Sequence, residues 1–341
     1  MITRRRLVQA TTGVAAGTLC SGPVRALAQA TPEAASRTQG ELPDGTWVFT
    51  DDRGIAVTLP TMPTRIVSSI EAGSALKDYG IDVLGVVGQI EDGSGNRVPE
   101  AGDLDPSTLA YLGEWDTFDL EAALALGADL FVDVTYWPDE PGTLYNVADE
   151  MVLLLEQQIP ILAIATGGGV SVEQPLARFR ALAEALGADV RTPGVVADVA
   201  AFDAAAQNAR SVFADRADVV AAFIYASPDE FVFYDPNLFA DTIMYQDLGL
   251  NALQITTNQG YTEELSPEQL QKYDFDVFFQ LLPGGEDPGT GLDAIPTIGS
   301  LPSVANGQVY RWQRNYAPSY RQFVPIFEAF IADMAKSQKV T

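Results

Sequence analysis

Two glutamates, Glu121 and Glu268, occupy the same place in two segments that echo each other. Each lies two residues after a helix-capping Asp or Ser, and each is followed eight residues later by an aspartate, Asp129 or Asp276, that opens an apolar strand. A carboxylate in the first turn of a helix is favoured by the helix dipole, so each glutamate taken alone can be a structural cap. The repetition predicts two similar α/β lobes, each presenting one acidic helix start.

The chain lacks the side chains on which many hydrolytic and metal sites depend. It has no histidine and one cysteine, Cys20. This excludes Ser-His-Asp and Cys-His nucleophile systems and His-rich zinc or manganese sites. Tyr136, Tyr225 and Tyr234, with carboxylates, could offer hard oxygen ligands to ferric iron, and tyrosine can also ligate haem iron. The residues therefore favour a binding protein over an enzyme.

The first 28 residues have the three parts of an export signal. A basic head with adjacent arginines at 4–6 precedes a mildly apolar stretch at 10–19, and Ala26-Leu27-Ala28 supplies a cleavage site. We expect export by the twin-arginine route to a periplasm, cell surface or extracellular space. Cys20 follows Leu19 rather than a small residue, so we expect it to leave with the signal; a lipid anchor on it is the alternative.

The mature chain is strongly acidic. Without the four arginines of the signal, 16 basic residues face 46 acidic ones, a net charge of -30. Such a chain repels nucleic acid and anionic lipid. No apolar run is long enough to span a membrane. We expect a soluble monomer without disulfides.

Helical and strand patterns alternate along most of the chain, which is typical of βαβ units around mainly parallel sheets. Residues 29–43 have the composition of a flexible tether. Between about 171 and 216 only helical patterns occur. We therefore predict an N-terminal lobe at 44–171, a connecting helix at 172–187 and a C-terminal lobe at 188–341.

Four motifs in order resemble the periplasmic binding proteins that serve ATP-binding-cassette importers of iron-siderophores, haem and cobalamin. The first has two parts, at 50–54 and 63–68, and the others lie at 120–130, 265–270 and 298–310; the resemblance covers residues 44–338. It implies an α/β fold with two Rossmann-like lobes joined by a single long helix. Ligand is held noncovalently between the lobes, which close modestly over it. In this family one glutamate per lobe docks to arginines of the permease dimer, and those positions match Glu121 and Glu268.

The resemblance makes an iron-siderophore-type chelate the leading ligand, with no further cofactor. A haem or cobalamin carrier of the same fold is the alternative, and an exported two-lobed enzyme is the remote one. Ligands of parallel α/β sheets meet loops at the carboxyl ends of strands. Aromatic and basic side chains in those loops suit a bulky, acidic chelate. The predicted ligand-binding residues are Trp115, Tyr136, Trp137, Tyr225, Tyr234, Arg314, Tyr316 and Arg321, of which the two tryptophans align with aromatic cleft positions of cobalamin-binding relatives. The Gly167-Gly168-Gly169 run lacks the Lys-Ser/Thr of a nucleotide loop and is interpreted as a hinge or lobe-edge loop.

Overall fold

The computed structural model describes residues 39–140, 142–227, 231–257, 260–282, 287–290, 292 and 295–341, without the side chains of Pro267, Glu268 and Gln271. The predicted signal peptide and residues 29–38 of the predicted tether lie outside these residues, whereas the end of the tether contains the short strand at Gly40–Glu41. In the described part, every helix is too short or too polar to cross a bilayer.

A small antiparallel sheet opens the described chain, as the alternation around residues 47–59 predicts. It consists of β1 (Gly40–Glu41), β2 (Trp47–Thr50) and β3 (Ala56–Leu59). The turn after β2 is closed by Asp51, whose Oδ1 accepts hydrogen bonds from the backbone N–H groups of Arg53 and Ile55, both at 3.0 Å. The buried Trp47 donates its indole N–H to the carbonyl of Ala185 at 2.7 Å and so ties this sheet to the first lobe.

The first lobe contains a wholly parallel sheet in the order β6-β5-β4-β7-β8. Its strands are β4 (Ile66–Ser69), β5 (Gly85–Val87), β6 (Ala110–Tyr111), β7 (Leu130–Thr135) and β8 (Ile161–Ala165). Its helices are α1 (Ile70–Asp78), α2 (Leu120–Ala125) and α3 (Asp149–Leu155), with 3-10 turns η2 (Pro99–Ala101) and η3 (Pro106–Thr108). Every residue of β4 and β7 is buried, as expected for strands covered on both faces.

The second lobe has a mixed sheet in the order β11-β10-β9-β12-β13. The strands are β9 (Ala221–Ala226), β10 (Phe231–Tyr234), β11 (Thr262–Glu264), β12 (Val277–Leu281) and β13 (Val309–Trp312). Strands β9, β12 and β13 are parallel, whereas β10 and β11 are antiparallel additions on one edge. The helices are α6 (Ala240–Asp247), α7 (Pro296–Gly299) and α8 (Pro302–Ala305), with the 3-10 helix η4 (Pro267–Lys272). The predicted two-lobed α/β fold is confirmed; its parallel character is complete in the first lobe and partial in the second.

The two aspartates of the echoing segments perform the same structural task in each lobe. Asp129 accepts hydrogen bonds from the backbone N–H groups of Thr64 and Arg65, at 3.0 and 2.9 Å, just before β4. Asp276 accepts one from the backbone N–H of Val220 at 2.8 Å, just before β9. Each carboxylate thus ties the start of one strand to the start of its parallel neighbour.

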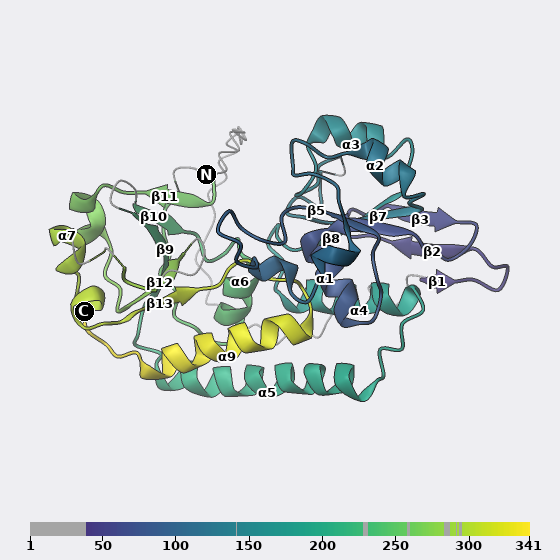
Figure 1. The fold of residues 1–341 in the computed structure, drawn as a ribbon. Helices are drawn as coiled ribbons and strands as arrows, with labels where there is room; N and C mark the ends of the chain where they lie inside the picture. Colours follow the sequence, from purple (N-terminus) through teal and green to yellow (C-terminus); the bar gives the residue numbers. More distant parts are fainter. Residues whose placement is uncertain are drawn as a thin grey trace, which may run out of the picture.

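Two helices cross between the lobes. The helix predicted at 172–187 forms as α4 (Glu173–Ala185); Val172 and Leu176 pack into the second-lobe core, and Phe179 packs into that of the first. The longer α5 (Pro193–Asp215) returns across the boundary and packs against α9 (Tyr320–Lys336). Figure 1 shows α5 and α9 side by side beneath both lobes. The lobe boundaries drawn from the sequence stay predictions.

Candidate ligand cleft between the lobes

A cavity lies where the two lobes meet, and both contribute to its walls. It holds about 580 Å³ of empty space, including the part open to solvent. The first-lobe lining is Glu71, Glu100, Val134, Tyr136, Tyr145 and Thr166, with Pro175 of α4, and the second-lobe lining is Phe239, Ala240, Asp241, Arg314, Asn315, Tyr316 and Pro318.

On the first-lobe wall, Glu71 shares an amide with a buried aspartate. Glu71 lies in the first turn of α1, whose N-cap is Ser69 at the end of β4. The Nδ2 of Asn146 donates to Glu71 Oε2 at 3.1 Å and to Asp133 Oδ1 at 2.9 Å. Burial, with the like charges of Asp133 and Glu100, raises the pKa of Glu71 to about 8. Burial also raises the pKa of Asp133 to about 6, even though hydrogen bonds from Asn146 and Val134 favour its ionised form.

Two further carboxyl groups complete the acidic lining. Burial raises the pKa of Glu100, the second residue of η2. Asp241, in the first turn of α6, is almost fully buried and accepts a hydrogen bond from the indole N–H of Trp312 at 2.7 Å. Burial raises its pKa to about 6 against that hydrogen bond. The cleft therefore carries acidic groups from both lobes.

Arg314 is the one cation among the described residues that line the cavity. Its guanidinium carbon lies 5.9 Å from the ring centre of Tyr234 and 5.1 Å from that of Phe239, close enough for cation–π attraction. Its Nε is buried and has no hydrogen-bond partner among the described residues, and the same is true of the Oγ1 of Thr166. Buried polar atoms without partners are rare in folded proteins, so both atoms are candidates to meet ligand oxygens.

The tyrosine wall depends on a glycine. The rings of Tyr136 and Tyr145 are 4.7 Å apart, and burial raises the pKa of Tyr136. A side chain at Gly167 would place its Cβ 2.1 Å from the Tyr136 ring, so only glycine fits there. The Gly167-Gly168-Gly169 loop follows β8 and lets this ring reach the cavity.

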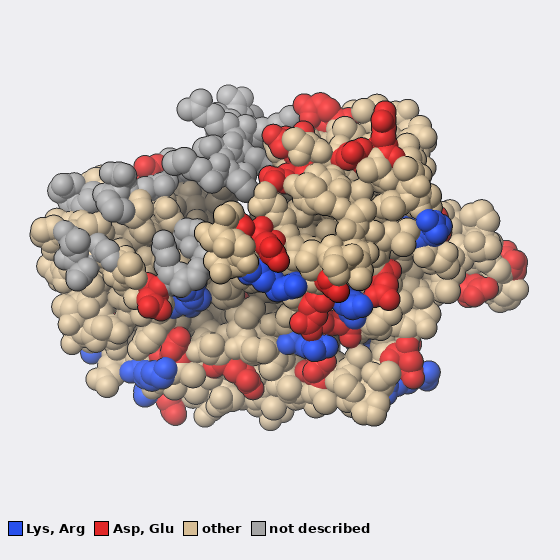
Figure 2. Space-filling model, viewed as in Figure 1, with Lys and Arg blue, Asp and Glu red and all other residues tan. Residues whose placement is uncertain are grey.

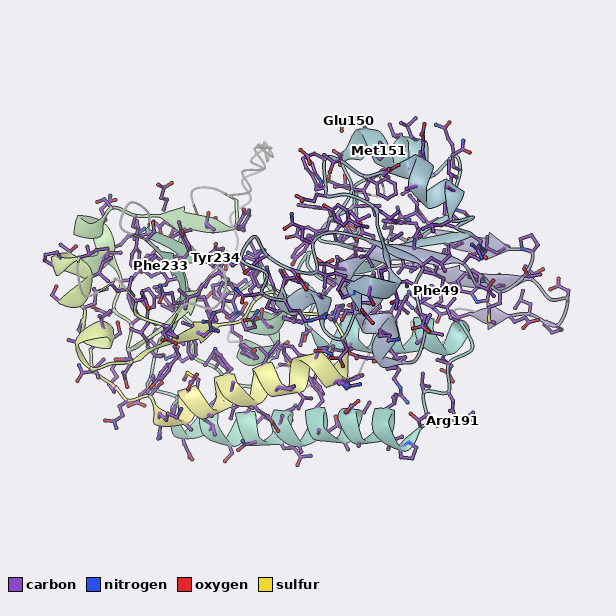
Figure 3. All side chains as sticks on the ribbon, viewed as in Figure 1. Phe49, Glu150, Met151, Arg191, Phe233 and Tyr234 are labelled. Carbon is purple, nitrogen blue, oxygen red and sulfur yellow. The ribbon has the colours of Figure 1, made fainter. Side chains whose placement is uncertain are left out.

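The eight predicted ligand-binding residues do not all reach the cavity. Tyr136, Arg314 and Tyr316 line it. Tyr234 lies next to it, under Arg314 and 5.2 Å from the ring of Trp312. Figure 3 shows Tyr234 in the second lobe. The other four are outside the lining: Trp115 is 42% exposed, Trp137 packs 6.1 Å from the Tyr136 ring, Tyr225 lies in β9 opposite Val232, and Arg321 lies in the first turn of α9.

Arg321 takes part in a joint between the lobes. Its guanidinium lies 3.0 Å from Asp103 Oδ2 and 3.9 Å from Asp78 Oδ1. Asp78, the last residue of α1, also accepts hydrogen bonds from Ser319, the N-cap of α9, and from Gln322 Nε2 at 3.3 Å. The contacts of Arg321 thus hold α9 against the first lobe, and a ligand role for it stays a prediction.

The two paired glutamates lie away from the cleft lining. Glu121 is exposed in the first turn of α2, whose N-cap is the predicted Asp119. Glu268 belongs to η4, where Ser266 and Gln269 form a capping box, but its side chain lies outside the described residues. Their docking role is untested by these positions.

Sequence reasoning missed the acidic lining, formed by Glu71, Glu100 and Asp241, and also Tyr145. A signal for Glu71 was present, because it follows the first parallel strand, where ligand loops are expected. Glu100 and Asp241 gave no such signal. Glu100 lies in a 3-10 turn and Asp241 at the start of a helix, and the two are too far apart in the sequence for their proximity in the fold to be predicted.

Searches against known proteins place the fold in one group. A scan against protein-family models and a search of the curated proteins returned no match. Among solved structures, the chain is similar to DesE, a ferric-siderophore receptor protein from Streptomyces coelicolor, with 31% identity and a TM-score of 0.77, covering 86% of this chain and 100% of that one.

Two more distant structures share the fold. One is the siderophore periplasmic binding protein from the fuscachelin gene cluster of Thermobifida fusca, at 20% identity and a TM-score of 0.59, covering 80% of this chain and 96% of that one. The other is the periplasmic catecholate-siderophore binding protein VctP from Vibrio cholerae, at 16% identity and a TM-score of 0.58, covering 85% of this chain and 99% of that one. The two-lobed fold with an interlobe cleft defines a solute-binding protein. The chain belongs to the iron-siderophore family of periplasmic solute-binding proteins of ATP-binding-cassette importers.

Proposed function

We propose that this protein captures a ferric siderophore-type chelate in the interlobe cleft and delivers it to an ATP-binding-cassette importer. The observation that carries the proposal is the buried Arg314, whose Nε has no partner among the described residues and which lines the cavity together with Tyr136 and Tyr316. Arginine donates strongly to anionic and oxygen-rich groups. Tyrosine rings supply apolar area and a hydroxyl for a bulky chelate.

Family membership supports the same ligand class, since the similar receptor from Streptomyces coelicolor is described as a ferric-siderophore receptor. We propose export by the twin-arginine signal at residues 1–28 and noncovalent capture without turnover. Delivery would use Glu121 and Glu268 as the contacts with the permease dimer. The lobe-closing motion would be modest, because α4, α5 and the α9 joint all cross the boundary.

The test is a titration of the purified mature protein with one ferric hydroxamate, one ferric catecholate, haem and cobalamin, followed by intrinsic tryptophan fluorescence. Trp137 packs against Tyr136 at the cavity, so occupation of the cleft should change the emission. We expect submicromolar binding of a ferric chelate. Tight binding of haem or cobalamin alone would show that the protein carries that ligand instead of a ferric siderophore. Chemical conversion of any of these ligands would show that the protein is an enzyme.

A further inference from the structure

Among the described residues that line the cleft, carboxyl groups outnumber cations, and a ferric chelate without a cationic group would not balance them. Glu71, Glu100 and Asp241 line it and Asp133 lies directly behind Glu71, whereas Arg314 is the only cation among the described lining residues. A cavity dominated by carboxyl groups disfavours a ligand that is anionic throughout. Arg314 can bind the neutral or anionic part of the ligand. The carboxyl groups of the lining would then favour a cationic group elsewhere on the same ligand.

Glu71 is the carboxyl group with the least compensation. Its side-chain hydrogen-bond donors, the amide of Asn146 and the hydroxyl of Ser69, are neutral. The charges that act on it most strongly are those of Asp133 in β7 and Glu100 in η2, both acidic. Tyr136, after β7, also faces it. Arg314 acts on Glu100 and Asp241 and stacks on Tyr234 and Phe239 of the second lobe. Glu71 therefore presents an acidic oxygen to the cavity without a protein cation of its own.

We propose that the cleft selects a chelate bearing a protonated amine, whose ammonium pairs with Glu71 and Glu100 while its oxygen-rich metal centre meets Arg314. This inference rests on the proposed function. The carboxyl groups of Glu71 and Glu100 come from the first lobe, whereas Arg314, whose buried Nε has no partner among the described residues, comes from the second lobe. The cleft is thus bipolar, and a matching ligand is bipolar too.

A protonation change accompanies this mode of binding. Because the pKa of Glu71 is raised to about 8, its carboxyl group is mostly protonated at pH 7 in the empty cleft. An ammonium within contact distance favours the carboxylate and lowers that pKa. The proton leaves Glu71 for the buffer as the ion pair forms, so binding of an amine-bearing chelate releases protons, whereas binding of a neutral analogue does not.

The experiment compares a linear ferric trihydroxamate that carries a free terminal amine with the same chelate after N-acetylation. The two share the iron centre and differ in one charge. For the wild-type protein at pH 7 we expect at least tenfold tighter binding of the amine form by calorimetry. Titrations in two buffers of different ionisation enthalpy should show proton release for the amine form alone.

The variant Glu71→Gln keeps an acceptor for Asn146 and removes the charge. It should show a smaller preference for the amine form and release fewer protons, because Glu100 stays in place. Glu150→Gln is the matched control, because Glu150 is exposed in α3 at the far edge of the first lobe (Figure 3) and should retain the wild-type preference. Equal wild-type affinities for the two chelates would overturn the inference, as would a preference in Glu71→Gln as large as that of the wild type.

Failure of the inference and failure of the proposed function give different results. If the acetylated chelate binds as tightly as the amine form, or if only a ferric catecholate binds, the proposed function stands but the selection of an amine-bearing chelate is wrong. Absence of binding by every ferric chelate overturns the proposed function and the inference together.

Discussion

At the scale of single residues, the cleft combines one buried cation with several carboxyl groups whose pKa is raised by burial. Desolvation dominates the pKa of Glu71, Asp133 and Asp241, and hydrogen bonds only partly offset it for the two aspartates. Such perturbed groups gather at functional sites more often than elsewhere. They make the cleft sensitive both to the charge of its ligand and to pH.

Arg314→Gln should weaken binding of a ferric chelate about 10- to 100-fold. The reason is the loss of charge-assisted hydrogen bonds to ligand oxygens, each contributing roughly 1.5–3 kcal/mol, where about 1.4 kcal/mol is tenfold. Fluorescence titration measures the change. Arg191→Gln is the control, since that side chain is 84% exposed and forms an ion pair with the likewise exposed Asp189 at the surface. Unchanged affinity in Arg314→Gln would remove this residue from the site.

Glu71 should make the protein less stable as pH rises. Its pKa in the folded state is about 8, above the ordinary value of 4.5, so the folded state holds the proton more tightly than the unfolded state between those values. The contribution of Glu71 to the free energy of unfolding is fully present below about pH 4.5 and decreases as the pH rises to about 8. Thermal unfolding should show Glu71→Gln matching wild type at pH 4 and exceeding it at pH 8 by at least about 2–4 °C, the shift expected for roughly 1 kcal/mol. A constant difference across pH would contradict this assignment.

At the scale of elements, helix ends hold the lobes together. The C-terminal end of α1 meets the N-terminal end of α9 through Asp78, whose side chain is 3% exposed and accepts hydrogen bonds from Ser319 and Gln322. A carboxylate at a helix N-terminus also interacts favourably with the helix dipole. This joint fixes the edge of the cleft close to Asn315 and Pro318, which line the cavity.

Asp78→Ala should lower the free energy of unfolding by about 1–3 kcal/mol, because Ser319 and Gln322 lose a buried acceptor. Urea unfolding of the ligand-free protein measures this. Asp189→Ala, which removes an exposed partner of Arg191, should change stability by less than about 1 kcal/mol. Equal effects of the two substitutions would mean that the joint contributes no more than a surface ion pair.

The order of the elements could be predicted from periodicity and from the echo, but the joints between distant segments could not. The starts of α5 and α9 carry strong local signals in the sequence, Thr192-Pro193 and Ser319, and Thr192 and Ser319 are the capping residues in the structure. The edge strands β10 and β11 run antiparallel although alternation favoured parallel pairing. Strand β10 follows β9 too closely in sequence for the crossover that a parallel pair needs. Of the site, the aromatic and basic residues after strands could be found, whereas Glu100 and Asp241 depend on how the lobes meet.

At the scale of the whole molecule, the acidic chain spreads its carboxylates over both lobes. Figure 2 shows Asp and Glu side chains across the visible face, with Lys and Arg side chains mostly beside them. Glu121 stands on α2 at the opposite side of the molecule from α5 and α9 (Figure 1). Placement away from the cleft fits a contact with a partner rather than with the ligand.

Glu121→Arg combined with Glu268→Arg should leave chelate affinity within about twofold and abolish iron uptake through the importer. The reason is repulsion between the new arginines and the basic residues that the family's permeases present. Uptake of radiolabelled ferric chelate by cells measures the effect. Glu328→Arg, an exposed position on α9, is the control and should support normal uptake. Loss of chelate binding in the double variant would assign the glutamates to the ligand site instead.

The most direct measurement of the central claim is a crystal structure of the protein loaded with a ferric chelate, with anomalous data collected at the iron edge. The account predicts one iron peak between the lobes, bordered by Tyr136, Arg314 and Tyr316, with the chelate's oxygen atoms near the guanidinium of Arg314. An iron peak outside this cleft, or a loaded crystal in which the cleft stays empty, would contradict it.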